Sequence, residues 1–230
     1  AVFAALPYIL RETDREYLEE LYEKATEAHI FRGFLIRSMD GLGFLRERKR
    51  GMGSAGKALS LRTDANVYAW NDSALEELAA LVDGFCLPYE LNASAQKGLY
   101  EGGLTKRLSC EKIIYSRIPM MVTANCLRRT VGRCGKGREI VKLRDRYSKE
   151  FPVLIDCRHC MNLIYNSVPF SLHKEGRPGE GAGWRGRVDL RMDFTLESPG
   201  ELKALLDAFF RGMPFPMKDY TTAHEKRGAV

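Results

Sequence analysis

The first 110 residues alternate between short apolar runs and segments whose apolar positions recur every three or four residues. The short runs have the length and composition of β-strands, and the recurring pattern is typical of amphipathic helices. The clearest helix lies within residues 13–28, with Thr13 or Asp14 as the expected N-cap. Its predicted apolar face consists of Tyr17, Leu18, Leu21, Tyr22 and Ala25.

Five apolar runs in this part of the chain are separated by helical patterns. Parallel strands need long crossover connections, which are usually helices, so this alternation predicts a parallel sheet. We expect an α/β fold of parallel β/α units, forming a partial or complete TIM-like barrel. The expected strands lie within 3–11, 31–38, 58–71, 85–92 and 110–122. The later helices are expected at 39–49, at 73–84 with Asp72 or Ser73 as N-cap, and at 93–100.

The pattern changes after Met121, where short β-like runs replace the helices. We therefore expect an inserted, mainly β, cysteine-bearing module over 122–172, following the β/α units of 1–121. The sequence Asp145–Lys149 has the composition of a hairpin turn. Residues 173–186 are Gly-rich and predict a flexible loop. A final β/α unit and a C-terminal tail are expected over 187–230, with Ser198 as N-cap and Pro199 as the first helical residue.

Composition places the chain among ordinary globular proteins, with 45% hydrophobic and 29% charged residues. No apolar run approaches the length of about 18 residues that a membrane span needs, so no membrane partner is expected. The chain starts without Met, and its first residues already resemble a strand. We therefore expect an N-terminal part of the same protein to precede it. Six cysteines and no export signal predict reduced thiols in the cytoplasm.

Positive charge is concentrated in one segment. Between Cys126 and Cys160 there are ten Lys or Arg and four acids. The net charge of this segment is therefore +6, the same as the net charge of the whole chain. A solvated basic face is one interpretation. An anionic partner is the other, and RNA is the obvious candidate. The residues expected to contact RNA are Arg128, Arg129, Arg133, Lys136, Arg138, Arg144 and Arg146, with Tyr147 and His159 as possible stacking groups.

The same segment carries four cysteines with the spacing C-x7-C-x22-C-x2-C, namely Cys126, Cys134, Cys157 and Cys160. Four thiolates can complete a tetrahedral zinc site or hold a four-iron cluster. The spacing leaves zinc, iron–sulfur and no metal all open. A thioredoxin-like redox pair is disfavoured because the CxxC lies late in the chain and leaves two cysteines unexplained. Cys86 and Cys110 are expected to be ordinary buried residues.

Several blocks resemble the collagenase-like peptidase family U-32, in particular the C-terminal half of its long subgroup. They include Arg117–Met121 (Arg-Ile-Pro-Met-Met), Asp145–Tyr147 (Asp-Arg-Tyr) and the stretch beginning at Cys157. The closing segment from Tyr220 is similar to the Thr-Gly-His ending of the family, with Ala223 where the family usually has glycine.

This resemblance implies hydroxylation of a pyrimidine base in ribosomal or transfer RNA. Within the family, the long subgroup is most similar to the ribosomal RNA cytidine hydroxylase. It implies a 4Fe–4S cluster on the four cysteines, with zinc as the alternative, and it assigns the chain to the whole enzyme or its cluster-bearing half. The alternatives are a collagenase-like peptidase, for which no nucleophile motif is evident, and a zinc-stabilised RNA-binding or interaction module. The candidate catalytic residues are Glu90, Tyr115, Arg117 and His159.

Overall fold

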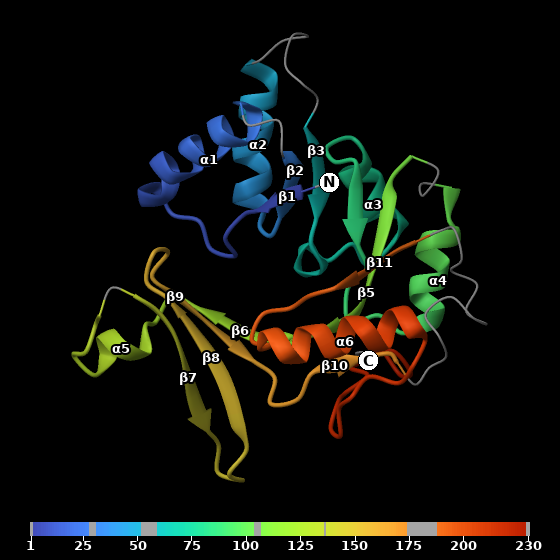
Figure 1. The fold of residues 1–230 in the computed structure, drawn as a ribbon. Helices are drawn as coiled ribbons and strands as arrows, with labels where there is room; N and C mark the ends of the chain where they lie inside the picture. The colour runs from blue at the N-terminus through green and yellow to red at the C-terminus, as the bar shows by residue number, and fades with distance from the viewer. Residues whose placement is uncertain are drawn as a thin grey trace. The chain divides into compact units, whose positions relative to one another are not determined.

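The computed structural model describes residues 2–27, 31–51, 59–103, 107–135, 137–173 and 188–228, without the side chains of 49–51. The chain divides into two compact units (Figure 1). The first unit contains residues 1–111, 187–189 and 227–230, and the second contains 112–186 and 190–226. Most of the expected loop 173–186 lies outside the described residues.

A parallel sheet forms the centre of the first unit, coloured from blue to green in Figure 1. Its strands pair in chain order, β1-β2-β3-β4-β5, and every one of these pairings is parallel. Such an order contains no reversal, which is the arrangement of β/α barrels and differs from that of doubly wound sheets. The strands are β1 (Val2–Ala5), β2 (Phe31–Ile36), β3 (Ser60–Thr63), β4 (Gly84–Cys86) and β5 (Ser109–Ser116).

Helices connect these strands, as the alternating pattern predicted. They are α1 (Arg15–Glu27), α2 (Met39–Gly51), α3 (Asp72–Ala79) and α4 (Ala93–Glu101), with one-turn 3-10 helices at Glu12–Asp14 and Ala65–Val67. Leu18 and Ala25 of α1 are buried, as expected for its apolar face. The prediction of a partial parallel β/α fold is confirmed. Within the described residues β1 pairs only with β2, so the sheet is open.

Close strand contact in this sheet depends on Gly33 of β2. A Cβ atom at this position would lie 1.7 Å from the carbonyl oxygen of Ser60 on β3, which no side chain could tolerate. The neighbouring Phe34 and Ile36 are almost completely buried. Burial of side chains this size contributes about 1.5–3 kcal/mol each.

Two expectations are corrected. The parallel order ends at β5, because β10 (Phe170–Ser171) pairs with β5 in the antiparallel direction and β11 (Asp189–Met192) also pairs with β5. A two-residue strand after Pro169 has no periodicity that a sequence could reveal. The N-cap of α3 is Asn71 and not Asp72 or Ser73, because its side-chain oxygen accepts from the Ala74 backbone N–H at 2.9 Å.

The second unit contains a four-stranded antiparallel sheet with the order β6-β9-β8-β7. Its strands are β6 (Pro119–Thr123), β7 (Arg138–Arg144), β8 (Glu150–Asp156) and β9 (Met161–Tyr165). The Asp145–Lys149 segment forms the expected turn between β7 and β8, where the Asp145 backbone N–H donates to the Lys149 carbonyl at 3.0 Å. A single helical turn, α5 (Leu127–Thr130), connects β6 to β7.

Helix α6 (Pro199–Arg211) packs against the strand residue Tyr115 through a small apolar core that includes Leu205 and Phe215. Ser198 caps this helix and Pro199 is its first residue, as predicted. Among the described residues, no helix is both long enough and apolar enough to cross a membrane.

Candidate four-cysteine site and basic strand

The topology of the antiparallel sheet brings the four cysteines to one of its ends. Thr123 at the end of β6 pairs with Asn162 on β9, and Arg138 at the start of β7 pairs with Asp156 at the end of β8. Cys126 follows β6 by three residues, and Cys134 precedes β7 by four. Cys157 and Cys160 lie in the turn between β8 and β9. Two connections, far apart in the sequence, therefore meet where the sheet ends.

In the first connection, between β6 and β7, hydrogen bonds to backbone carbonyls hold the residues around Cys126 in place. This residue is the N-cap of α5, and its carbonyl accepts from the backbone N–H and the hydroxyl of Thr130, both at 3.0 Å. The side-chain amide of Asn162, which is fully buried, donates to the Asn125 carbonyl at 2.8 Å. This bond ties β9 to the residue immediately before Cys126.

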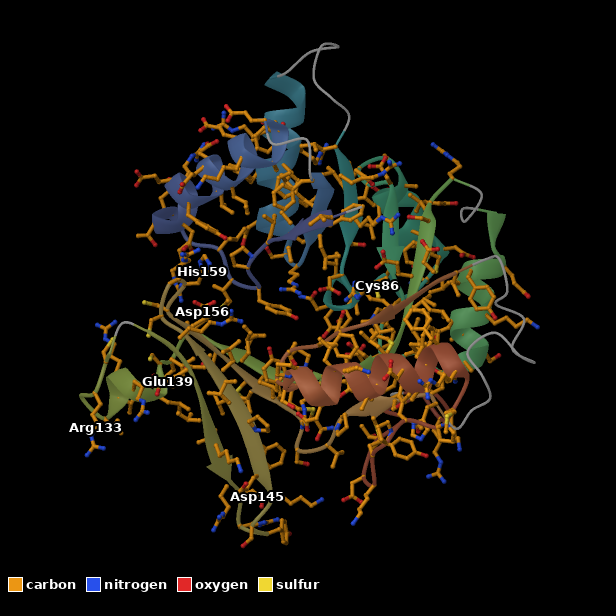
Figure 2. The ribbon with its side chains drawn as sticks, in the orientation of Figure 1. Cys86, Arg133, Glu139, Asp145, Asp156 and His159 are labelled. Carbon is orange, nitrogen blue, oxygen red and sulfur yellow. The ribbon has the colours of Figure 1, made fainter. Side chains whose placement is uncertain are left out.

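The second connection is the four-residue turn from Cys157 to Cys160. Asp156 accepts a hydrogen bond from the Arg158 backbone N–H at 3.1 Å, and Cys160 has a φ of +43°, in the left-handed region. The Cys160 Sγ lies 3.7 Å from the Cys157 carbonyl oxygen. His159 is buried, with 6% of its surface exposed, between the exposed Arg158 and Cys160. Figure 2 labels His159 and Asp156 at this end of the sheet, and Asp145 at the other.

The four thiols are electrostatic neighbours. The pKa of Cys157 is raised above its usual value, first by desolvation and then by Cys134, Cys126 and Cys160. Each of these three cysteines disfavours the thiolate form of Cys157, because like charges repel. The four thiols are therefore close enough to interact electrostatically. All six cysteines of the chain are free, and Cys86 and Cys110 are buried in β4 and β5, as expected.

Metal binding requires more than this proximity. No group of three or more His, Cys, Asp or Glu within the described residues is arranged closely enough to hold a metal ion. The donor set itself fits a soft metal, because four thiols from two loops are the ligand number and type of zinc and iron–sulfur centres. The four cysteines are therefore chemically suitable ligands and lie at the same end of the sheet. Their side chains do not have the arrangement of a formed metal site.

Salt bridges neutralise part of the basic segment. Arg128 forms two hydrogen bonds with the Glu139 carboxylate, at 2.5 and 2.7 Å, which lowers the pKa of Glu139. Lys142 and Arg144 both bind Glu150, at 2.6 and 3.0 Å. The Arg146 guanidinium lies 4.7 Å from the centre of the Tyr147 ring.

Three arginines remain exposed without such a partner. Within the described part of the chain, no ion pair is formed by Arg129, Arg133 or Arg138. Arg129 belongs to α5, Arg133 directly precedes Cys134, and Arg138 begins β7, so all three lie at the cysteine end of the sheet. Lys136, the other expected contact there, lies outside the described residues. We call Arg129, Arg133 and Arg138 the arginine cluster.

The candidate catalytic residues separate into different places. Tyr115 is buried in the apolar core beneath α6, and its hydroxyl donates to Glu197 Oε1 at 2.9 Å. Desolvation and this carboxylate raise the pKa of Tyr115. The Arg117 Nε lies 3.6 Å from the same Glu197 oxygen. The structure therefore joins Tyr115 and Arg117 through Glu197, a residue that the sequence did not single out because nothing in its local pattern indicates a buried carboxylate.

Glu90 lies shortly after β4, in the first unit, and interacts with Tyr68. The pKa of Tyr68 is raised, first by desolvation and then by the charge of Glu90 and a hydrogen bond to it. Tyr68 follows a short 3-10 helix and has a φ of +47°, and no motif in the sequence marks it as a partner of Glu90.

The pair formed by Ser171 and His173 does not present a nucleophile for peptide cleavage. The Ser171 Oγ and His173 Nδ1 are 2.8 Å apart, but Ser171 has no exposed surface. A substrate could not reach this hydroxyl, so the pair gives no support to a peptidase.

Comparison of the chain with protein-family models, with curated proteins and with solved structures gives no match.

Proposed function

We propose that the chain is an RNA-modifying hydroxylase that acts on a pyrimidine base of rRNA or tRNA, or the iron–sulfur-bearing half of such an enzyme. The observation that carries this proposal is the meeting of four thiols and the arginine cluster at one end of the antiparallel sheet. The four-stranded sheet then serves as an inserted cysteine-bearing module.

The thiols would hold the metal centre. Cys126, Cys134, Cys157 and Cys160 supply the four sulfur ligands that a 4Fe–4S cluster uses, and such a cluster supplies electron transfer when it is bound. Cys126 is anchored by Thr130, and its loop is tied to β9 by Asn162, so this ligand loop is partly ordered by the protein itself.

The arginine cluster would bind the RNA backbone. Arginine forms paired hydrogen bonds with phosphate, and contacts of this kind position a nucleic acid without reading its sequence. Arginines already paired with Glu139 or Glu150 would have to exchange one anion for another. Arg129, Arg133 and Arg138 need no such exchange, which makes them the more effective phosphate ligands. The buried His159 is close to the thiols along the chain and is retained as a candidate for positioning the base.

The experiment that tests this function compares rRNA and tRNA from cells with and without the gene by mass spectrometry. We expect the deletion strain to lack one pyrimidine modification that corresponds to a single added oxygen atom, and the full gene to restore it. A gene with Cys157→Ser should fail to restore it. Unchanged rRNA and tRNA in the deletion strain would contradict the proposal.

A zinc-stabilised RNA-binding module is the second candidate, and the sheet-end arrangement favours it. Structural zinc sites commonly take two thiolates from each of two loops, one of them a CxxC turn. Metal analysis of anaerobically purified protein separates the two. Iron with sulfide and a brown colour supports the hydroxylase, whereas colourless protein with one zinc per chain supports the binding module.

A further inference from the structure

A second group of chemically distinctive residues lies in the first unit, away from the cysteines in sequence. Asn66, Tyr68 and Trp70 follow β3, and Glu90 follows β4. Because β3 and β4 are parallel neighbours, their carboxyl ends lie at the same edge of the sheet. Ligands of α/β proteins bind at this edge, where the loops are free to carry specific side chains. We call these four residues the carboxyl-edge cluster.

Two aromatic side chains of the cluster are exposed together. Tyr68 and Trp70 are 50% and 41% exposed, and their ring centres are 6.4 Å apart with the planes tilted by 54°. Tyr68 also adopts a left-handed backbone conformation, with φ +47° and ψ +59°. A bulky residue in this region stores strain, and such strain is concentrated at ligand sites.

Two oxygen acceptors of the cluster lack partners. Asn66 Oδ1 and Glu90 Oε2 are shielded from water, and neither accepts a hydrogen bond from the described residues. The Asn66 amide is held in place, because its Nδ2 donates to the Arg37 carbonyl at 2.6 Å. A buried acceptor without a donor is unfavourable, so both oxygens would gain a full hydrogen bond from an incoming N–H group.

The combination defines the ligand. An exposed aromatic pair binds flat rings by stacking, and two unpaired acceptors require a ligand that offers N–H donors. We propose that the carboxyl-edge cluster binds a nucleobase that carries an exocyclic amino group. The base reaches Glu90 Oε2 and Asn66 Oδ1 once the side chains that shield them move aside, and it donates to both oxygens. It stacks on one ring of the pair, Tyr68 or Trp70, and lies edge-on to the other, because the two planes are tilted by 54°. Uracil and hypoxanthine lack the amino group and fit the site poorly.

This inference does not depend on the proposed function, because it uses neither the cysteines nor the arginine cluster. The ligand could be a free nucleotide or a base within single-stranded RNA, and both present the same ring and amino group. The two sources are distinguished by testing mononucleotides and short oligonucleotides separately.

Tryptophan fluorescence provides the direct test. The sequence contains two tryptophans, Trp70 and Trp184, so the full chain with Trp184→Phe reports on Trp70 alone. We expect saturable quenching by guanosine and cytidine monophosphates, each bound about 10-fold or more tightly than its matched partner without the amino group, inosine or uridine monophosphate. Equal binding of the two members of each pair, or no saturable quenching by nucleotides or oligonucleotides, would overturn the proposal.

Variants measured by calorimetry separate the roles of the side chains. Tyr68→Gly removes the ring and suits the left-handed backbone, so we expect a folded protein whose affinity for guanosine monophosphate is about 5- to 100-fold lower. Tyr68→Phe should keep most of the affinity, because it keeps the ring and because the base donates to Glu90 Oε2, which accepts no bond from the Tyr68 hydroxyl. Full affinity in Tyr68→Gly would contradict stacking.

Recognition of the amino group is tested at Glu90. In Glu90→Gln we expect the preference for guanosine over inosine monophosphate to fall towards one, while Glu77→Gln on the exposed face of α3 should leave it unchanged. A preference that survives Glu90→Gln would overturn the assignment. The Cys157→Ser protein should bind guanosine monophosphate as tightly as the wild type does. Loss of the metal site and loss of the carboxyl-edge cluster are therefore distinguishable.

Discussion

At the scale of single residues, Ala223 adopts a left-handed backbone conformation that glycine adopts more readily. Ala223 has a φ of +48° within a turn in which the Glu225 N–H donates to the Thr222 carbonyl at 3.1 Å. An L-residue with a Cβ is strained in this region and glycine is not. Glycine is therefore the residue that this backbone conformation favours at position 223.

We therefore predict that Ala223→Gly raises the free energy of unfolding by about 0.5–1 kcal/mol, because relief of the strain exceeds the greater unfolded-state entropy of glycine. Urea denaturation measures the change. The matched control is Ala204→Gly on the exposed side of α6, which should lower stability by about 1 kcal/mol. A loss of stability in both variants would show that Ala223 is unstrained.

Local chemistry predicted the cap of α6 but misplaced the cap of α3, which is Asn71. Residues whose roles depend on distant partners were not predictable from the sequence. Ser198 and Pro199 mark the start of α6 as expected, since capping is decided within four residues. Glu197 lies directly beside them, yet its bond to Tyr115 joins positions 82 residues apart. No local pattern contains that information.

At the scale of elements, the first turn of α6 should make stability depend on pH. Glu201 accepts hydrogen bonds from the backbone N–H and hydroxyl of Ser198, and these bonds lower its pKa in the folded protein. A carboxylate with a lowered folded pKa stabilises the fold above its unfolded pKa of about 4.3, and this contribution disappears as the pH falls through the folded value.

We expect Glu201→Gln to reduce stability at neutral pH and to have a smaller effect at an acidic pH below the lowered pKa of Glu201, where the wild-type carboxylate is itself protonated. Urea denaturation at the two pH values provides the measurement. Asp207→Asn, which removes a carboxylate paired with Lys203 away from the N-terminus of α6, is the control for general charge effects. An equal effect of Glu201→Gln at both pH values would exclude the capping contribution.

Strand β7 should determine how strongly RNA binding depends on salt. Arg138, Glu139 and Ile140 are all exposed, and exposure alternates only from Ile140 to Arg144. Strand β7 is an edge strand, and Arg138 is its first residue, at the cysteine end of the sheet. Replacement of the arginine cluster by alanine should lower the slope of log affinity against log salt by about two to three, because each phosphate contact releases close to one counterion.

The control for this prediction is Lys142→Ala on the same strand, since Lys142 is already neutralised by Glu150. Filter binding or anisotropy with single-stranded RNA at several salt concentrations gives both slopes. If Lys142→Ala lowers the slope as much as each cluster arginine does, intramolecular pairing does not decide which residues contact phosphate.

At the scale of the whole molecule, the alternation of strands and helices was sufficient to predict parallel β/α units. It did not predict where the parallel order ends, because β10 contains only two residues and pairs with β5 across more than 50 residues of chain. The cysteine spacing suggested that the four thiols form one site. The x7 and x22 separations alone could not show that the two pairs of cysteines lie close together in the fold. The register of the β7–β8 hairpin and of β9 with β6 determines that both loops reach the same sheet end.

Metal content tests this convergence for the full chain. We predict that protein purified without oxygen carries metal and that Cys157→Ser loses most of it, together with thermal stability of the second unit. Cys86→Ser, which changes a buried thiol of β4 in the first unit, should keep the metal content of the wild type. Elemental analysis and thermal unfolding with and without a chelator measure both effects. Equal metal content in the two variants would show that the four thiols are not the ligands.

One end of the β7–β8 hairpin lies beside the loops that carry the four cysteines, and the other end is a turn without cysteines. Its turn, Asp145–Lys149, is seven residue pairs from the pair Arg138 and Asp156, a distance of roughly 20 Å along the strands. Residues added in matched pairs at that turn would lengthen the hairpin while preserving which side chains face which way. The length of this hairpin can therefore change without any change to the loops that carry the four thiols.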